Sequence, residues 1–403
     1  MLLEGVSVIE VSAFGQGPMV GVILADLGAN VVKIEPPAGD PSRRIKKVNG
    51  VNQEVPYPDG GTSSTPFEVY NRGKRGVSID LKTDDGKAAL GRLVEKADIF
   101  VHNTPPDVAD RLAIDFKSIS AVNPDIVYLE CTSFGSAGPW SGAPSFDLAA
   151  LAFSGMLYSG VVGEGQPLDL VGAMGDSASG SMAALAVLAG LAGKARGRRG
   201  ALRLESSQLG SLVWLQNFHF ASVALQGIGL ESRPRTQPVN PLYNMYECRD
   251  HQWLVLTELE PTGPWATIWL LLDREDMVLD ERGSSLELLI EHQAEIISEL
   301  DVAFRSQDRN ELVVAFRDAG IKCAPINRVK DICVSEQVIS NGYMQPVTGT
   351  DWMLPVVPVK FDGRPVGDAT RAPRLGEHTK EVFLEHGLTE EEYSLLREAR
   401  VLN

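Results

Sequence analysis

Short apolar runs alternate with amphipathic segments along the first 130 residues of the chain. Runs rich in β-branched residues predict strands at 6–11, 29–35, 77–80, 98–102 and 125–130. The segments 18–27 and 87–96 have the apolar spacing typical of helices. Strands that alternate with helices form βαβ units, whose sheets are parallel and buried on both faces. The pattern therefore predicts an α/β domain with a doubly wound parallel sheet.

The pattern of apolar positions changes after about residue 225. A helical pattern at 205–226 leads out of the first domain, and alternation at 243–248 and 252–257 predicts a hairpin. Helical patterns follow at 265–271, 286–300 and 311–319. These elements predict a smaller α+β domain over residues 226–331.

The C-terminal part of the chain predicts a return to the first domain. Residues 332–359 are rich in Pro and Gly and lack helical periodicity, as expected for a linker. Helical patterns follow at 377–386 and 389–400, and Thr389 and Glu392 have the spacing of a capping box. We therefore expect the large domain to comprise residues 1–225 and 360–403.

The composition is that of an ordinary globular protein, with 44% apolar and 22% charged residues. The net charge of -16 opposes general electrostatic binding to nucleic acid or to an anionic lipid surface. The apolar stretches 148–163 and 182–193 are shorter than the roughly 20 residues that cross a membrane. We therefore expect neither nucleic acid nor a membrane as a partner.

The cysteines and histidines do not form a metal-binding pattern. The closest cysteines, Cys323 and Cys333, are far more widely spaced than the ligands of a zinc knuckle. We interpret the cysteines as reduced thiols of a cytoplasmic protein and expect no metal site. The phosphate-binding loop of ATPases and the nucleophile elbow of α/β-hydrolases are also missing from the sequence.

Glycines after the first predicted strand imitate a dinucleotide-binding motif. Gly15, Gly17 and Gly21 follow that strand, and Glu35 ends the next one. The imitation is imperfect because Pro18 removes a backbone N–H and the last glycine comes one position late. A nicotinamide-dependent dehydrogenase is therefore retained as an alternative function, and a tight turn that packs against the sheet is the simpler interpretation.

Three basic clusters interrupt the acidic background. They are Arg43, Arg44, Lys46 and Lys47; Arg72, Lys74 and Arg75; and Lys194, Arg196, Arg198, Arg199 and Arg203. A polyphosphorylated ligand of an acidic protein needs local clusters of this kind, because distant exposed charges are screened. The clusters do not identify the ligand, and each is also compatible with a solvated turn.

Asp176 stands at the start of a predicted helix of small residues, 176–191. Its carboxylate can serve as the N-cap of that helix. The same position suits a nucleophilic carboxylate, because helix N–H groups keep it ionised and can stabilise a neighbouring oxyanion. The residues alone leave both roles open.

Ordered motifs over nearly the whole chain resemble the class III CoA-transferase family, which includes formyl-CoA transferase and the α-methylacyl-CoA racemases. The motifs lie at residues 3–11, 17–18, 25–40, 71–82, 102–106 with Arg111, 123–124, 175–180 and 371–379. The resemblance implies that Asp176 is the nucleophile that takes CoA from an acyl-CoA and passes it to a free carboxylic acid. It also implies aspartyl anhydride and thioester intermediates, with no permanently bound cofactor.

The family also implies where coenzyme A binds and how the subunits assemble. The matching positions are Arg43, Asn103 and Arg111, with Gln16, Lys74 and Arg75 as further candidates. The implied fold is a Rossmann-like large domain with a smaller α+β domain, in an interlocked homodimer.

Three departures from the family pattern bear on the substrate. Gly15 stands where formyl-CoA transferase has a glutamine, and residues 237–240 replace its glycine-rich lid, so formyl-CoA and oxalyl-CoA are disfavoured. Ser145-Phe146-Asp147 stands where the racemases have Gly-His-Asp, so one of their proton carriers is missing. An acyl-CoA racemase or isomerase stays open as the alternative within this fold.

Overall fold

The computed structural model describes residues 2–163, 165–170, 172–367 and 369–403. The chain divides into two units, which we describe separately. The first comprises Met1–Tyr158, Leu168–Leu230 and Glu336–Asn403, and the second comprises Ser159–Pro167 and Glu231–Ser335.

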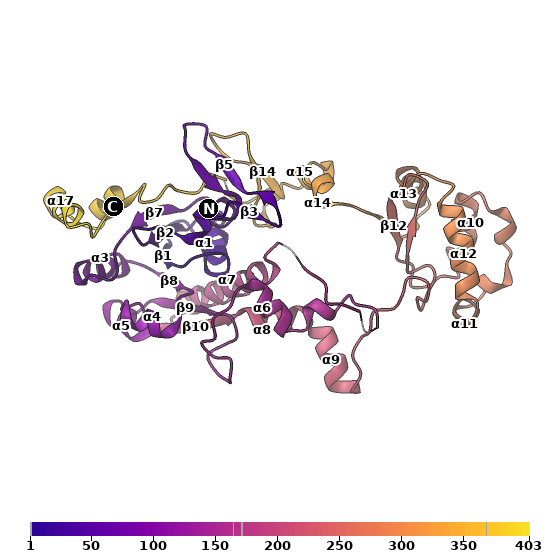
Figure 1. Ribbon diagram of the computed structural model, residues 1–403, viewed down its shortest axis with the longest axis horizontal. Helices are drawn as coiled ribbons and strands as arrows, with labels where there is room; N and C mark the ends of the chain where they lie inside the picture. The colour runs from indigo at the N-terminus through magenta and orange to yellow at the C-terminus, as the bar shows by residue number, and fades with distance from the viewer. Residues whose placement is uncertain (1, 164, 171, 368) are drawn as a thin grey trace. The chain divides into compact units, whose positions relative to one another are not determined.

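A six-stranded sheet forms the centre of the first unit (Figure 1). Its strands, in spatial order, are β10 (Leu202–Ser207), β9 (Val127–Thr132), β8 (Ile99–His102), β1 (Ser7–Val11), β2 (Asn30–Glu35) and β7 (Arg75–Ser78). Every pair is parallel. In chain order this is 6-5-4-1-2-3, the order of doubly wound nucleotide-binding folds. The expected α/β fold with a parallel sheet is confirmed.

Helices cover both faces of this sheet because the apolar side chains alternate between them. Val8 packs with α1 (Gln16–Asp26) and α7 (Met174–Ala195) on one face. Its neighbour Ile9 packs on the other face with α3 (Asp84–Val94), α5 (Phe116–Val122) and α16 (Thr379–Glu385). This two-residue alternation explains why both faces are apolar.

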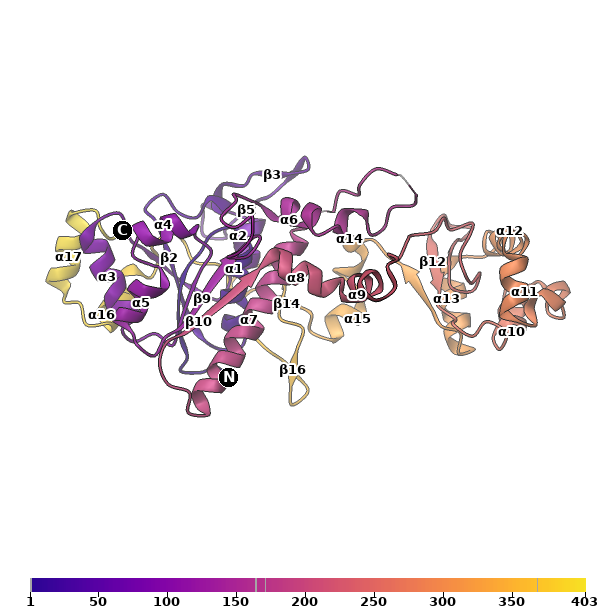
Figure 2. The same ribbon diagram turned by 90° about the horizontal axis from the view of Figure 1, so that it is seen from below.

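Helix α7 is long and apolar enough to cross a membrane by length and composition alone. It runs alongside β9 and β10 (Figure 2), and its Ala183, Ala184 and Val187 are buried against the sheet. Helix α1 approaches it closely, because a Cβ at Gly180 would lie 2.9 Å from the carbonyl oxygen of Gln16. This side of α7 therefore belongs to the interior of the first unit.

The helix predicted over 205–226 begins too early and overlaps the end of a strand. Residues Leu202–Ser207 form β10, and two helices follow, α8 (Gln208–Leu215) and α9 (Asn217–Gln226). The strand lies at the sheet edge, where Leu202 and Leu204 alternate with exposed Arg203 and Glu205. Ser207 ends it and caps α8, since its hydroxyl accepts the N–H of Gly210 at 3.0 Å.

Shorter elements complete the first unit. Its small strands are β3 (Lys47–Val48), β4 (Val51–Asn52), β5 (Glu54–Pro56), β6 (Thr62–Ser64), β14 (Met344–Pro346), β15 (Met353–Pro355), β16 (Lys360–Phe361) and β17 (Arg364–Pro365). Its other helices are α2 (Thr65–Asn71), α4 (Pro106–Arg111), α6 (Asp147–Phe153), α15 (Glu336–Ser340) and α17 (Glu390–Glu398), with a 3-10 turn at Pro41–Arg44. Residues 332–359, expected to be a linker, thus contain a short helix and a two-stranded sheet.

The C-terminal helices α16 and α17 return to the first unit and lie beside α3 and β7 (Figure 1). Arg75 on β7 pairs with Glu381 and Glu385 of α16 at 2.7 and 2.8 Å. The capping box expected at Thr389 and Glu392 is present at the start of α17.

The second unit has a three-stranded antiparallel sheet of β11 (Met245–Glu247), β12 (Trp253–Leu256) and β13 (Cys323–Ile326). Its helices are α10 (Trp265–Leu271), α11 (Leu286–Glu291), α12 (Gln293–Phe304), α13 (Arg309–Asp318) and α14 (Val329–Ile332). The expected hairpin is β11 and β12. The single helix predicted over 286–300 is two helices that meet at His292.

Candidate active site

A pocket of about 990 Å³ opens at the carboxyl ends of the parallel strands. It is lined by residues that follow β1, β2, β7, β8 and β9, together with Asp176 and Gln208. Strands β1 and β8 are neighbours in the sheet, and the chain winds away from them in opposite directions. Ligands of doubly wound folds bind at this switch point.

The loop after β1 is fastened to the loop after β8. The side-chain amide of Asn103 accepts the N–H of Ala13 at 3.0 Å and donates to the Ala13 carbonyl at 2.8 Å. Buried Lys33 donates to the carbonyl of Ser12 at 2.8 Å. Phe14 is held with a φ of 64°, in the left-handed region that bulky residues rarely occupy. These contacts fix the loop where it meets α7.

Asp176 is the third residue of α7 and does not cap it. The residue before the helix is Ala173, with a φ of 52°. The capping carboxylate comes instead from Asp147, whose Oδ1 accepts the N–H of Asp176 at 2.7 Å. The N-cap interpretation of Asp176 is therefore wrong, because the helix starts two residues earlier and a distant aspartate caps it.

The Asp176 carboxylate is free of the helix and faces the start of α1. The amide of Gln208 donates to its Oδ1 at 2.6 Å, and the backbone of Gln16 also hydrogen-bonds to it. Only glycine fits at position 15, because a Cβ there would collide with this carboxylate. The glycine at position 15, where formyl-CoA transferase has a glutamine, thus leaves space for the carboxylate of Asp176.

Burial and a like charge make Asp176 an unusually weak acid. Burial, and then the negative charge of Asp147, raise the pKa of Asp176 to about 6, although the bonds from Gln208 and Gln16 oppose the rise. Burial also raises the pKa of Asp147. Near pH 7, Asp176 is therefore mostly ionised but more basic than an ordinary aspartate.

Gln208 and Asp147 were not identified from the sequence. Gln208 is buried at the first turn of α8, and its Oε1 has no hydrogen-bond partner among the described residues. Tyr70 of α2 is also near, since burial and the charge of Asp176 raise its pKa to about 12. These residues come from separate elements. Asp147 stands in the stretch that matches the Gly-His-Asp motif of the racemases, which was a signal for it, whereas no local motif marks Gln208 or Tyr70.

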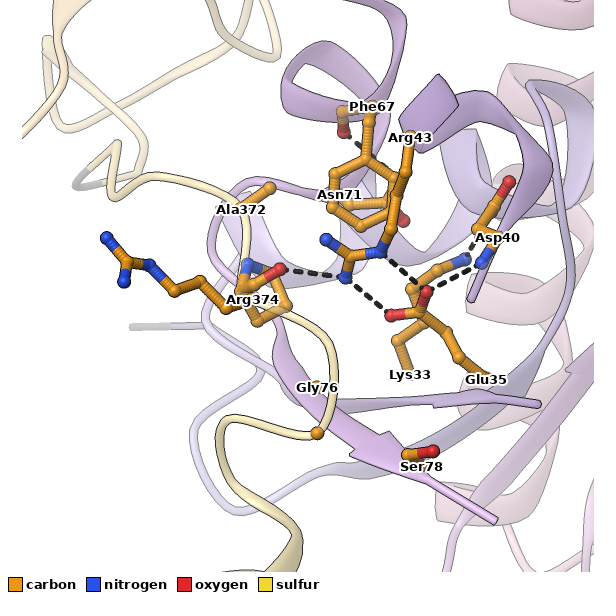
Figure 3. Close-up of polar contacts among 12 residues, drawn as sticks. Lys33, Glu35, Asp40, Arg43, Phe67, Asn71, Gly76, Ser78, Ala372 and Arg374 are labelled. Carbon is orange, nitrogen blue, oxygen red and sulfur yellow. Dashed lines mark hydrogen bonds and ion pairs between the residues drawn. The ribbon is translucent and has the colours of Figure 1, made fainter. Parts of the chain in front are cut away.

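Arg43 is occupied by contacts within the protein (Figure 3). Its guanidinium makes two hydrogen bonds to Glu35, at 2.8 and 2.7 Å, and one to the carbonyl of Pro373 at 2.9 Å. It also lies 3.6 Å from the centre of the Phe67 ring. Glu35 is likewise used by Arg43 and by the N–H of Asp40, so its carboxylate is not open to the ribose of a dinucleotide.

The other expected binding residues differ in their surroundings. Gln16 and Asn103 line the pocket. Lys74 is fully buried, pairs with Glu10 at 2.6 Å and has its pKa lowered by burial to about 8. Arg75 is paired with α16, as described above. Arg111 is exposed at the end of α4 and pairs at 3.0 Å with the equally exposed Asp107, which lines the pocket.

Two basic side chains in the pocket lining are not among the CoA contacts that the family implies, namely Lys82 and Arg203, although Arg203 belongs to the third basic cluster of the sequence. Lys82 is exposed in the loop after β7. Arg203 pairs with Glu130 at 2.8 Å and lies 6.0 Å from the centre of the Phe116 ring of α5. No group of three or more His, Cys, Asp or Glu in the described part of the chain is arranged to hold a metal ion.

Comparisons with known proteins identify the family. The model for CoA-transferase family III matches residues 3–379. An (R)-2-hydroxy-4-methylpentanoate CoA-transferase of Clostridioides difficile is 28% identical over 100% of both chains. A cinnamoyl-CoA:phenyllactate CoA-transferase of Clostridium sporogenes is 28% identical over 97% of this chain and 95% of the relative.

A solved structure has the same fold. A CAIB/BAIF family protein from Brucella suis superposes with a TM-score of 0.86 and 23% identity, over 95% of this chain and 99% of that one. The family model and the two transferases together cover the parallel sheet, the pocket at its carboxyl ends and Asp176. The resemblance seen in the sequence motifs is thereby confirmed, and the chain belongs to CoA-transferase family III.

Proposed function

We propose that Asp176 is the nucleophile of CoA transfer from an acyl-CoA to a free carboxylic acid. One observation carries this proposal: a carboxylate with its pKa raised to about 6 lines the pocket at the switch point of a doubly wound sheet. A nucleophile is stronger when its conjugate acid is weaker, provided that it is still ionised. The two CoA-transferases described above act on carboxylic acids, as their names state.

The reaction proceeds through two kinds of covalent intermediate. Asp176 attacks the thioester carbonyl of the donor, which forms an aspartyl–acyl anhydride and releases CoA thiolate. The thiolate attacks the aspartyl carbonyl, which releases the donor acid and leaves an aspartyl-CoA thioester. The acceptor carboxylate attacks this thioester to form a new anhydride, and the thiolate then attacks its acyl carbonyl to give the product and free Asp176. One thioester replaces another, so the CoA thioester is the only cofactor needed.

The groups bonded to Asp176 have a part in these steps. Gln208 and the backbone N–H of Gln16 donate to the carboxylate. When Asp176 becomes an acyl group, the same donors face the oxygen that gains negative charge in each tetrahedral intermediate. We therefore assign Gln208 to orienting the nucleophile and to stabilising that oxygen.

The contacts of the six residues that the family implies for CoA binding divide them into two groups. Asn103 and Gln16 line the pocket, and Asp107 is the one ion-pair partner of exposed Arg111 among the described residues, so these residues are our candidates for binding CoA. A phosphate of CoA can replace Asp107 as the partner of Arg111 at a small cost in free energy, because exposed ion pairs contribute little to stability. Arg43, Lys74 and Arg75 are held in internal ion pairs, and we assign them to supporting the loops of the site.

We further propose that the enzyme is a homodimer, interlocked as in its family, and acts in the cytoplasm. Helix α9 supports the dimer, because no residue on it is buried although it carries Phe218, Phe220 and Leu225. Exposed apolar surface of this kind is typical of a subunit interface. The four unpaired cysteines fit a reducing compartment.

Isotope exchange tests the proposed reaction. Wild-type protein incubated with an acyl-CoA and the deuterated free acid of the same acyl group should transfer label into the thioester, as measured by mass spectrometry. Asp176→Asn should reduce this exchange to background, whereas Asp318→Asn, on an exposed position of the second unit, should not change it. Substantial exchange by the Asp176→Asn variant would contradict the proposal.

Asp176→Asn should also change how the stability of the protein depends on pH. The folded protein holds the Asp176 proton more tightly than the unfolded chain, since the pKa rises from 3.8 to about 6. The stabilisation that this proton gives is present below about pH 4 and is lost as the pH rises through 6. Asparagine removes the buried charge, so Asp176→Asn should unfold at the same or a higher temperature than the wild type at pH 8. This result would exclude unfolding as the cause of inactivity.

A further inference from the structure

Two phenylalanines form an aromatic wall directly beside Asp176. The rings of Phe14 and Phe146 meet edge to face, with their centres 5.3 Å apart and their planes at 82°. Phe14 precedes Gly15, and Phe146 precedes Asp147; both of these following residues contact Asp176. Both rings line the pocket. The aromatic wall is therefore placed where the group attached to the reacting carbonyl must lie.

Both rings remain exposed to the pocket, so the protein does without the stability that their burial would provide. Phe146 is 66% exposed and Phe14 is 37% exposed, although large apolar side chains are stabilising when buried. The left-handed backbone of Phe14 is also strained, and it is retained because Asn103 holds the neighbouring Ala13 through both of its backbone groups. Strain that the surroundings maintain in this way is a mark of a functional position.

The charges of the pocket select against a second carboxylate on the acyl group. The described lining contains six acidic residues, namely Glu35, Asp80, Asp107, Glu130, Asp147 and Asp176, and two basic residues, Lys82 and Arg203. Arg203 lies in register with Tyr128, which packs on the face opposite to α7, and it is already paired with Glu130. Asp147, which contacts the start of α7, is acidic as well.

From this arrangement, and on the basis of the function proposed above, we infer that the acyl site accepts monocarboxylic acids with an apolar, preferably aromatic, side chain. The acyl group packs against the aromatic wall of Phe14 and Phe146. A dicarboxylic acid would place its second carboxylate beside Asp147 without a cation to receive it. Phe146, in the stretch that replaces the racemase motif, and Phe14, which precedes Gly15, thus set the substrate class.

Isotope exchange within single acids tests this inference without any need to know the natural pair. Each of 3-phenylpropanoyl-, 4-methylpentanoyl-, butanoyl-, succinyl- and glutaryl-CoA is incubated with its own deuterated acid. We expect kcat/KM for 3-phenylpropanoyl-CoA to exceed that for glutaryl-CoA at least tenfold. Phe146→Ala should lower the 3-phenylpropanoyl value roughly ten- to hundredfold, and the butanoyl value by less than about threefold. Phe14→Ala, which also removes a strained side chain, should act in the same direction.

The control is Phe361→Ala, since Phe361 is also exposed but lies on β16 outside the pocket lining. Faster exchange with succinate or glutarate would overturn the inference, as would equal losses for all acids in the Phe146→Ala variant. In both cases exchange would still depend on Asp176, so the proposed function would stand. Absence of exchange with every acid, including the monocarboxylic ones, would overturn the proposed function and the inference with it.

Discussion

The carboxylates of Asp176 on α7 and Asp147 at the start of α6 lie close together but have different roles. Asp147 accepts the N–H of Asp176 and so caps α7, while the carboxylate of Asp176 points away toward Gly15 and Gln208. The cap fixes the backbone of the nucleophile, and its negative charge helps to keep the nucleophile basic. Loss of that charge should therefore be visible in the pH dependence of the reaction.

The rate should rise with pH through the pKa of Asp176 and level off above it, because only the ionised carboxylate attacks. In the wild type this acid limb is expected near pH 6. Asp147→Asn keeps an oxygen that can accept the helix N–H but removes the charge, so the limb should move to lower pH. The movement should be partial, since burial is the larger cause of the raised pKa.

The measurement is kcat/KM for isotope exchange between about pH 4.5 and 8, which reports ionisations of the free enzyme. Asp318→Asn provides the control for removal of an unrelated charge. An acid limb that stays in place in the Asp147→Asn variant would show that Asp147 does not act on the nucleophile.

At the scale of elements, the loop after β2 depends on an ion pair with little access to water. Glu35 at the end of β2 is 1% exposed at its side chain, and Arg43 in the following 3-10 turn is bonded to both of its oxygens. Removal of one partner of such a pair leaves a buried charge and costs about 3–5 kcal/mol. Arg43→Ala should therefore lower the free energy of unfolding by roughly that amount.

This outcome separates a supporting role for Arg43 from phosphate binding. Chemical denaturation measures the stability of Arg43→Ala, and the double variant Arg43→Ala/Glu35→Gln should recover part of the loss. Arg44→Ala is the matched control, because the exposed Arg44 donates to the carbonyl of Ala38 and has no ion pair with another described residue. A raised KM for acyl-CoA at unchanged stability would instead place Arg43 on the nucleotide.

The strands of the sheet differ in how well the sequence predicts them. The five predicted strands are buried on both faces, so each is a short run of β-branched residues bounded by polar ones. Strand β10 was missed because it is only partly buried, whereas β7 at the opposite edge of the sheet is mostly buried and was predicted. Its alternating Leu and charged residues lead without a turn into α8, so the combined segment has the composition of a helix.

The site was predicted only where a motif marks it. Asp176 follows from the family motif, and the small residues of α7 fit its close packing on α1. Asp147 and Gln208 lie 29 and 32 residues from Asp176 in the sequence and meet it only when α6 and α8 pack beside α7. The basic clusters were visible, but their acidic partners lie on other elements, so the sequence could not separate internal ion pairs from free cations.

At the scale of the whole molecule, the proposed dimer interface includes the exposed apolar surface of α9. Phe218 and Leu225 are 74% and 79% exposed, and Trp214 of α8 is 63% exposed. If two chains interlock, a dimer cannot separate without partial unfolding. We therefore expect one dimeric species at nanomolar concentration, measured by mass photometry after long dilution. Monomers in equilibrium with dimers at micromolar concentration would contradict the interlocked assembly.

In the proposed mechanism, the Asp176 carboxylate becomes covalently bound to acyl and CoA groups during turnover, and these bonds can be trapped. Wild-type protein should be mixed with an acyl-CoA, quenched with hydroxylamine, digested and analysed by mass spectrometry. Anhydrides and thioesters of a carboxylate react with hydroxylamine, whereas a free carboxylate does not. The covalent mechanism predicts a hydroxamate at Asp176 in the wild type that is absent without acyl-CoA and in Asp176→Asn. An unmodified Asp176 peptide during active turnover, or a hydroxamate at another residue, would contradict it.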